Sequence, residues 1–343
     1  MKDCFNTIVG NKALCRRIAD DILSSKPPHA IILEGPHGTG KHTIARQTAA
    51  ALVCERSADS SAPLPCLSCL SCRKVLENKS PDVTVIGCDG KASIGVDAVR
   101  FVREDINLIP NDSDYKVYII EDADKMTSQA QNALLLTLEE PPAYAHFFLL
   151  CENSGLLLET IRSRAPTLRT ELLSKDDIDK YISTTDRRAA QMKLSDPKGY
   201  GELLMASGYG IGQALEYLDP KTFAPISQIR ALASDFVSTS IRSRGASEAI
   251  PLLARFSTKR DLLAEQLEAI LEAIRDLIIM KKSDTAVLCF FADRDLAIEL
   301  SDRVSMAFLF GLFQSVSEAK NEINQNANVK LCLMKLASKV GLV

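Results

Sequence analysis

A glycine-rich stretch, IILEGPHGTGKHT over residues 31–43, contains residue types that bind phosphate groups. Its glycines permit backbone angles at which successive N–H groups point inward at an anion, and a lysine at this spacing reaches the terminal phosphates. The pattern usually continues with Ser or Thr to hold Mg²⁺, but here His42 occupies that position. We therefore expect phosphate binding with an impaired metal site; a glycine-rich turn that binds nothing is the alternative. The residues expected around the phosphates are Gly35, Gly38, Thr39, Gly40, Lys41, His42 and Thr43.

The residues around this stretch predict the strand and helix that must position it. Residues 30–33 form a short apolar run typical of a buried strand, and the run breaks at Gly35 and Pro36. A helical pattern begins at Lys41 and continues to Leu52. The positive end of that helix would face the phosphates. The sequence thus predicts a strand, a loop and a helix in the order that nucleotide binding requires.

Four cysteines form a second group, with the spacing C-x11-C-x2-C-x2-C. Four soft sulfur ligands are typical of a closed tetrahedral Zn²⁺ site with no position open for catalysis. The segment between them is rich in Ser, Ala and Pro and cannot pack a core alone, so a metal would supply its folding energy. Unrelated thiols or a redox pair are the alternative. The metal ligands that we expect are Cys54, Cys66, Cys69 and Cys72.

Two carboxylates follow a predicted buried strand at residues 116–120. Glu121 and Asp122 would lie at the edge of the sheet beside the glycine-rich loop, where one carboxylate can hold a metal and the other can polarise water. Nucleotidases of this type generally have Asp followed by Glu, whereas this chain has the reverse order. Solvated acids at the end of a strand are the alternative.

An arginine pair, Arg162 and Arg164, flanks Ser163 after an apolar run at residues 147–151. Such a pair is usually surface charge. It gains a chemical role if Arg164 faces a neighbouring subunit, where a guanidinium can clamp a phosphate in trans.

Length and composition indicate two or three domains and a cytoplasmic protein. The chain has 343 residues, of which 46% are hydrophobic and 25% charged. It contains no apolar run of about 18 residues, as a membrane span needs, and its start lacks the order of a signal peptide. We expect its cysteines to bind metal or remain free thiols. The net charge of −3 and the pI of about 5.9 exclude binding of nucleic acid through a global positive field.

Strands and helices alternate over the first 170 residues. This alternation predicts an α/β domain with a parallel sheet covered on both faces. The further strands that we expect are at residues 83–86, 147–151 and 167–170, and the further helices at residues 11–25, 95–106 and 128–140.

The strands stop after about residue 171, and the rest of the chain has helical patterns. Residues 173–219 indicate short helices with breaks at 196–200 and 208–212, and longer runs follow at 259–282 and 303–320. The predicted domains are an α/β domain at 1–170 with a zinc module at 54–72, a small helical domain at 171–221, and an all-helical domain at 222–343.

Five segments carry a resemblance that covers nearly the whole chain. They are FNTIVGNKAL, GPHGTGKHT, the four-cysteine insertion, VYIIEDADKMTSQAQNALLLTLEEPP and ETIRSRAPTLR. Together they resemble bacterial DNA polymerase III clamp-loader subunits of the AAA+ family. A sequence such as the one from Glu121 to Pro142, ending in LEEPP, is rare outside this group. The resemblance implies an AAA+ P-loop domain with a zinc-binding insertion, a helical lid domain and a helical collar through which subunits assemble.

The resemblance also implies roles for single residues. In the family the insertion binds zinc, and the Ser-Arg-Cys motif, here residues 163–165, offers its arginine, here Arg164, to the nucleotide on the adjacent subunit. The nucleotide-binding positions that it adds are Ile8 and Val9, in the segment that flanks the adenine, and Glu152 or Asn153, near the sensor-1 position.

Two departures distinguish this chain from the family's motor subunits, gamma and tau. His42 replaces the threonine that holds Mg²⁺, and Gly212 aligns with the sensor-2 arginine. Both changes weaken hydrolysis while Arg164 remains, which is similar to the delta-prime type of subunit, a rigid partner that completes a neighbour's active site. The alternatives are a gamma/tau-like ATPase in which Thr43 or water fills the metal site, and another AAA+ replication or recombination factor such as a helicase loader.

The implied function is to help load the sliding clamp onto primed DNA, without independent enzymatic activity. The implied partners are gamma/tau and delta subunits, the clamp, and primer–template DNA whose phosphates several subunits would contact together. The implied cofactors are a structural Zn²⁺ and ATP with Mg²⁺.

Overall fold

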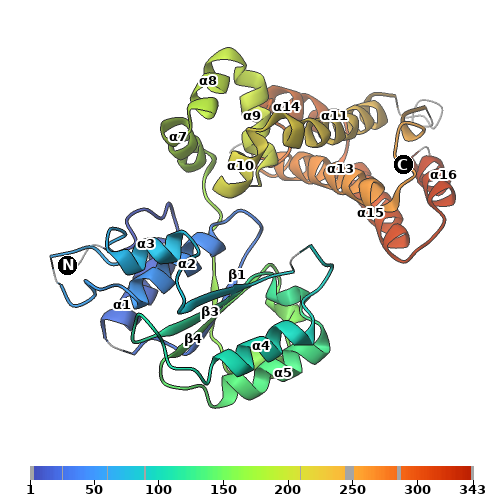
Figure 1. Cartoon of the computed structure of the whole chain (residues 1–343). Coiled ribbons are helices and arrows are strands. Elements are labelled where there is room, and N and C mark those ends of the chain that lie inside the picture. The colour runs from blue at the N-terminus through green and yellow to red at the C-terminus, as the bar shows by residue number, and fades with distance from the viewer. Residues whose placement is uncertain are drawn as a thin grey trace. The chain divides into compact units, whose positions relative to one another are not determined.

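The structure, a computed structural model, describes residues 4–24, 26–59, 61–88, 90–208, 210–243, 251–283 and 287–340. The chain forms two compact units. The first comprises Met1–Asp177 and Gly210–Gly212, and the second comprises Ile178–Tyr209 and Gln213–Val343. The first unit contains a sheet with helices on both sides, and the second contains helices (Figure 1).

A five-stranded parallel sheet is the centre of the first unit. Its strands, in spatial order, are β2 (Val83–Ile86), β3 (Lys116–Ile120), β4 (Ala145–Cys151), β1 (Ala30–Glu34) and β5 (Thr167–Arg169). Both β3 and β4 are buried along their whole length. Burial on both faces is why their sequences are continuous apolar runs rather than alternating ones. The predicted parallel α/β sheet is confirmed.

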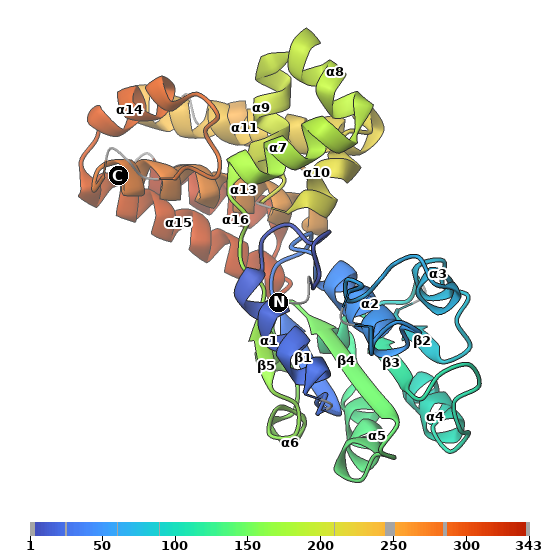
Figure 2. The same cartoon turned by 90° about the vertical axis from the view of Figure 1, so that its left-hand side faces the viewer.

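Helices cover both faces of this sheet, as Figures 1 and 2 show. The helices on one face are α1 (Lys12–Leu23), α2 (Lys41–Leu52) and α3 (Leu70–Leu76), and those on the other are α4 (Val96–Asp105), α5 (Ser128–Glu139) and α6 (Glu159–Arg162). Each face has its own apolar core, because successive side chains of a strand point to opposite sides. In β1, Ile31 and Leu33 belong to the first core, and Ala30 and Ile32 to the second.

The predicted elements of this unit are confirmed, with shifts at their ends. β2 and β3 have the predicted bounds, whereas β4 begins at Ala145 rather than at residue 147. α5 ends at Glu139, because Pro141 disfavours helical geometry in the residue before it. α3 has no counterpart in the sequence prediction; it begins after Cys69, whose sulfur accepts the N–H of Cys72 and caps the helix.

Helices make up the described chain from Lys175 onward, apart from connecting segments. They are α7 (Lys175–Thr185), α8 (Arg187–Ser195), α9 (Pro197–Ala206), α10 (Ile211–Tyr217), α11 (Pro220–Ser243), α13 (Arg260–Met280), α14 (Arg294–Asp302), α15 (Met306–Asn324) and α16 (Val329–Val340). In the second unit α13 packs against α11 and α15, and α16 packs against α15. Phe236, Ile270 and Leu312 are among the fully buried side chains of this core.

Two sequence predictions for this half differ from the structure in their bounds. The break predicted at residues 196–200 is present but narrower: α8 ends at Ser195, and α9 begins at Pro197 after its N-cap Asp196, whose carboxylate accepts the N–H of Gly199. The run at 303–320 is not continuous, since α15 begins at Met306 after its N-cap Ser305. The predicted break near Gly208 is confirmed; this glycine has φ +57°.

No described helix is long and apolar enough to cross a membrane. The division of the helical half into a lid at residues 171–221 and a collar at residues 222–343 stays a prediction.

Candidate functional site

The glycine-rich loop connects β1 to α2, as predicted. Gly38 and Gly40 have φ values of +78° and +91°, a region that glycine adopts without steric cost. At Gly35 the reason for glycine is steric, because a Cβ there would lie 1.9 Å from Thr170 Oγ1. α2 begins at Lys41, directly after the loop, so its positive end lies at the loop. This arrangement has the geometry of a phosphate-binding loop.

The Lys41 ammonium is bound to the loop itself. Its Nζ donates to the carbonyl oxygens of Gly35 at 2.5 Å and Pro36 at 2.8 Å, and the residue is only 6% exposed. Burial lowers the pKa of Lys41, and the nearby Glu152 carboxylate acts in the opposite direction. A phosphate that enters the loop must therefore compete with these carbonyl oxygens for the ammonium.

The two threonines of the loop differ in environment. Thr39 Oγ1 donates to the carbonyl oxygen of Pro36 and lies against Thr170 Oγ1, both at 2.8 Å, and Thr39 is buried. Its hydroxyl therefore fixes the shape of the loop. Thr43 is exposed on the first turn of α2, one position beyond His42.

His42 and Glu121 form a direct contact at the position where a metal is expected. His42 Nδ1 lies 2.8 Å from Glu121 Oε1, and the two side chains are 48% and 26% exposed. The hydrogen bond with His42 is the main reason why the pKa of Glu121 is lowered. The residues that replace the usual threonine and aspartate ligands of Mg²⁺ thus bind each other.

The second carboxylate, Asp122, has a cationic partner. Its Oδ2 lies 3.2 Å from Lys125 Nζ, at the end of the short 3-10 helix η1 (Ala123–Lys125). Asp122 has φ +51°, a backbone region that non-glycine residues seldom adopt. The second of the two expected carboxylates is therefore paired with a neighbouring lysine.

The candidate sensor-1 residues are fixed by Asp124. Its Oδ2 accepts the backbone N–H groups of Glu152 at 3.0 Å and Asn153 at 3.2 Å. The Asn153 side chain accepts the N–H of Gly155 and caps η2 (Ser154–Leu156). Asn153 thus serves the local turn, and its predicted contact with nucleotide stays a prediction.

The segment predicted to flank the adenine lies beside α2. Thr7 Oγ1 accepts a hydrogen bond of 2.7 Å from Gln47 Nε2, and Ile8 packs against the core on that face of the sheet. Val9 is half-buried. The N–H of Phe5 donates to the carbonyl oxygen of Leu64, which joins this segment to the cysteine-containing insertion.

Gly210–Gly212 contact the loop within the first unit. The N–H of Gly212 donates to the carbonyl oxygen of Gly38 at 3.4 Å. A Cβ at Gly210 would lie 2.7 Å from the Gly38 backbone, so glycine permits this approach. At Gly212, the position expected to align with a sensor-2 arginine, the chain offers a backbone N–H to the loop.

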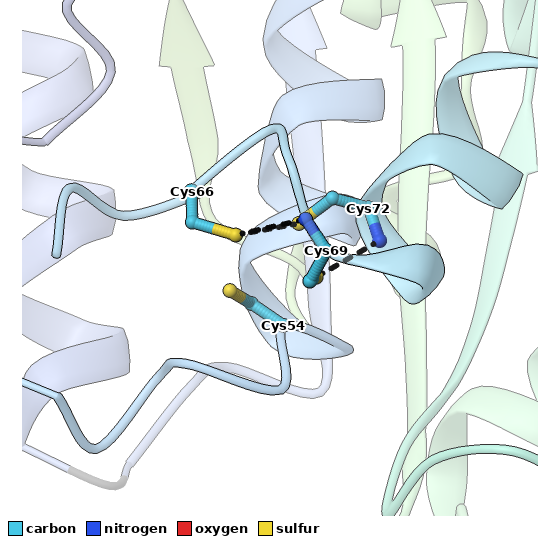
Figure 3. A group of neighbouring side chains, drawn as sticks. All are labelled: Cys54, Cys66, Cys69 and Cys72. Atoms are coloured by element: carbon cyan, nitrogen blue, oxygen red, sulfur yellow. Dashed lines mark hydrogen bonds between the residues drawn. The ribbon is translucent and has the colours of Figure 1, made fainter.

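The four cysteines predicted as metal ligands come together in the insertion (Figure 3). All four are buried, and their Sγ atoms lie within 4.8 Å of one another. The sulfurs of Cys66 and Cys72 are 4.0 Å apart. This distance is close to the ~3.8 Å between ligands of a tetrahedral zinc site with Zn–S bonds of ~2.3 Å, and much longer than a disulfide bond of ~2.05 Å.

Backbone N–H groups point at two of these sulfurs. The N–H of Cys69 donates to Cys66 Sγ and the N–H of Cys72 to Cys69 Sγ, both at 3.4 Å. Burial alone would raise the pKa of Cys66, but hydrogen bonds from Ser68 and Cys69 outweigh it and lower the pKa to about 6. Four soft ligands at these distances, supported by N–H donors, fit a structural metal.

Arg164 lies just beyond α6, with its guanidinium partly exposed. Nη1 donates to the carbonyl oxygen of Thr160 at 3.0 Å, and Nη2 lies 2.8 Å from Glu139 Oε1. Arg162, by contrast, is exposed. The structure therefore gives Arg164 a defined position at the end of α5.

Three residues of the site were not expected from the sequence. Thr170 contacts the loop residue Thr39, and Lys125 contacts the carboxylate of Asp122. Glu139 contacts Arg164. Two of them have a local signal: Lys125 stands three positions after Asp122, and Glu139 is the last residue before the Glu140–Pro141–Pro142 sequence that ends α5.

Comparison with known proteins identifies relatives of the first half of the chain. Residues 10–174 match the family model described as "DNA polymerase III, delta subunit". The DNA polymerase III subunit gamma of Buchnera aphidicola subsp. Schizaphis graminum is 34% identical over 178 residues, which are 52% of this chain and 48% of that protein. The DNA polymerase III subunit tau of Bacillus subtilis is 31% identical over 218 residues, which are 63% of this chain and 37% of that protein.

The chain thus spans about half or less of the length of these relatives. A crystal structure of a DNA polymerase III gamma subunit-related protein from Thermotoga maritima covers 95% of this chain at 18% identity, with a TM-score of 0.46. Over about half of its length, this chain is thus similar to the family described as DNA polymerase III, delta subunit, and to subunits gamma and tau of DNA polymerase III.

Proposed function

We propose that this protein is a non-hydrolysing subunit of a DNA polymerase III clamp loader, of the delta-prime type. The observation that carries the proposal is the hydrogen bond between His42 and Glu121. In hydrolysing relatives these two positions would supply the oxygen ligands of Mg²⁺. Here an imidazole and a carboxylate bind each other, and imidazole is a poor ligand for Mg²⁺, which prefers oxygen.

The other carboxylate and the lysine support the same conclusion. Asp122 is paired with Lys125, and Lys41 donates to the loop's own carbonyl oxygens. Phosphoryl transfer depends almost entirely on positioning and on stabilisation of charge by the metal and cations. A site in which each of these groups is bound to other atoms of the protein would lack the main contributions to catalysis.

Arg164 gives the protein a role in hydrolysis by a neighbour. Its guanidinium is partly exposed and held at the end of α6, from where it would reach the γ-phosphate of ATP on an adjacent subunit. Charge developing on that phosphate would be stabilised by an arginine fixed in advance. The neighbour would be a gamma/tau-type subunit, and a delta-type subunit would complete the assembly.

The remaining parts of the proposal follow from the same assignment. The complex would act in the cytoplasm on the sliding clamp and on primer–template DNA, whose phosphates the subunits would bind together. The helices from residue 222 onward would form a collar with those of other subunits. Cys54, Cys66, Cys69 and Cys72 would hold a structural Zn²⁺, which contributes folding energy to the insertion.

A second candidate function is that of a gamma/tau-type motor. The observation that favours it is that the relatives reported above are gamma and tau subunits. It requires Thr43 or water to replace the missing Mg²⁺ ligand, although Thr43 is exposed on the next position of α2.

Co-purification tests the assignment to a complex. The tagged full-length chain should recover gamma/tau-type and delta-type subunits from its own cell extract, both with and without ATP. Matched extracts lacking the tagged chain are the control. Recovery of a different AAA+ assembly, with no clamp-loader subunit, would contradict the proposal.

The His42–Glu121 contact predicts that any nucleotide binding does not depend on Mg²⁺. The Kd for a fluorescent ATP analogue should change by less than about threefold between Mg²⁺ and EDTA, since no metal contact is lost. The matched variant is His42→Thr combined with Glu121→Asp, which restores oxygen ligands and should make binding stronger in Mg²⁺ than in EDTA. A Mg²⁺ requirement of the unaltered chain as large as that of the double variant would refute the proposed loss of the metal site.

A further inference from the structure

Arg164 is held by a contact that the proposed function does not by itself require. Its Nη2 lies 2.8 Å from Glu139 Oε1, and Nη1 donates to the carbonyl oxygen of Thr160 and lies 3.4 Å from Ser163 Oγ. Thr160 and Ser163 are neighbours in sequence, whereas Glu139 comes from another helix. Among the described contacts of the guanidinium, only the one with Glu139 fixes it relative to α5.

The position of Glu139 is itself well determined. It is the last residue of α5, because Pro141 prevents the helix from continuing. At the other end of α5, the buried Gln131 side chain accepts the N–H of Leu158 and donates to the carbonyl oxygen of Leu156. α5 and the segment that leads to Arg164 are therefore joined at both ends of the helix.

This arrangement leaves the guanidinium able to bind an anion. A guanidinium has five N–H donors, and the contact with Glu139 uses one donor of Nη2 and leaves the other. The negative end of α5 also lies beside it and favours a cation there. The pair is partly exposed, with side chains that are 34% and 46% accessible, and such pairs are easily exchanged for a stronger anionic partner.

An arginine side chain that exchanges freely between rotamers loses conformational entropy when it binds a phosphate. The planar guanidinium loses less entropy when it is oriented in advance. We propose that Glu139 is a positioning residue, which holds Arg164 in the orientation from which it stabilises the phosphate on the neighbouring subunit. This inference rests on the proposed trans role of Arg164, and it concerns the rate of hydrolysis rather than the affinity for ATP.

The test compares substitutions in the assembled complex with gamma/tau-type and delta-type subunits. Glu139→Ala removes the contact and should lower kcat about fivefold at the site that Arg164 faces, with KM at that site changed less than about twofold. Glu139→Gln keeps the acceptor oxygen and should retain at least about half of the activity. Glu140→Ala, an exposed acid one residue later, is the matched control and should leave the rate unchanged.

A double substitution distinguishes positioning from general damage. In an Arg164→Ala background, Glu139→Ala should cause no further fall, because the residue acts through Arg164. A merely structural role would instead give the same fall with and without Arg164. The pair is worth little to stability, so thermal unfolding of the chain should shift by less than about 3 °C.

Several results would overturn the inference. An unchanged rate in Glu139→Ala would do so, as would an equal fall in the Arg164→Ala background. A loss of activity in Glu139→Gln as large as in Glu139→Ala would also contradict it. A rate increase in either Glu139 variant would mean that Glu139 keeps the arginine away from the phosphate. A complex that hydrolyses ATP normally after Arg164→Ala would refute the proposed function itself, and this separates the two failures.

Discussion

Replacing Arg164 with Ala should abolish most ATP hydrolysis at the one site of the assembled complex that this residue faces. Arginines supplied in trans to other NTPases contribute about 10³–10⁵ in rate, so we expect a fall of at least about 10²-fold at that site. In the proposed role the guanidinium stabilises charge that develops on the γ-phosphate, and Ala would leave that charge without its partner. Single-turnover hydrolysis of labelled ATP by the reconstituted complex measures the effect.

Assembly should survive this substitution. Arg164 is partly exposed and its contacts are made by its side chain at the surface, so its removal leaves the core intact. Gel filtration of the complex verifies assembly. Arg162→Ala is the matched control, because Arg162 is an exposed arginine two residues earlier, at the end of α6, and a complex with this variant should hydrolyse ATP at the unaltered rate. Equal rates in all three complexes would exclude a trans role for Arg164.

Loss of one cysteine ligand should remove the metal and destabilise the insertion. Elemental analysis of the unaltered protein should find one zinc per chain, and Cys69→Ser should contain far less. Structural zinc contributes about 10–16 kcal/mol to the folding of small zinc-binding peptides, which sets an upper bound for the loss. The variant should therefore unfold at a markedly lower temperature.

The effect should spread from the insertion to the segment that flanks the nucleotide loop. The backbone of Phe5 is bonded to Leu64, between the first and second cysteines, so the segment at residues 5–9 should exchange its amide hydrogens faster. Cys88→Ser is the control, because Cys88 lies outside the cluster and is half-buried. A folded protein that contains no metal and melts like the Cys69→Ser variant would disprove the zinc assignment.

Local patterns predicted the elements that carry the site. The apolar run of β3, the glycines of the loop and the two C-x2-C steps each fix a short segment, and the structure places these segments as expected. The alternation of strands and helices also predicted the parallel sheet. In these cases the physical cause lies within a few residues of the pattern.

The contacts that decide the chemistry could not be predicted in this way. His42 and Glu121 are 79 positions apart, and only the packing of α2 beside β3 brings them together. Glu139 and Arg164 are 25 positions apart and meet because α5 ends where it does. The break at Asp196 is a local effect by contrast, since Asp followed by Pro both ends α8 and begins α9, but the sequence predicted a longer break than the structure has.

Steady-state ATP hydrolysis by the purified chain alone tests the central claim most directly. With saturating Mg²⁺ and ATP the account predicts turnover indistinguishable from the buffer blank, whereas adding the chain to gamma/tau-type and delta-type subunits should raise their hydrolysis. Turnover by the isolated chain at the rate of a motor subunit, dependent on Mg²⁺ and lost in Lys41→Ala, would contradict the account.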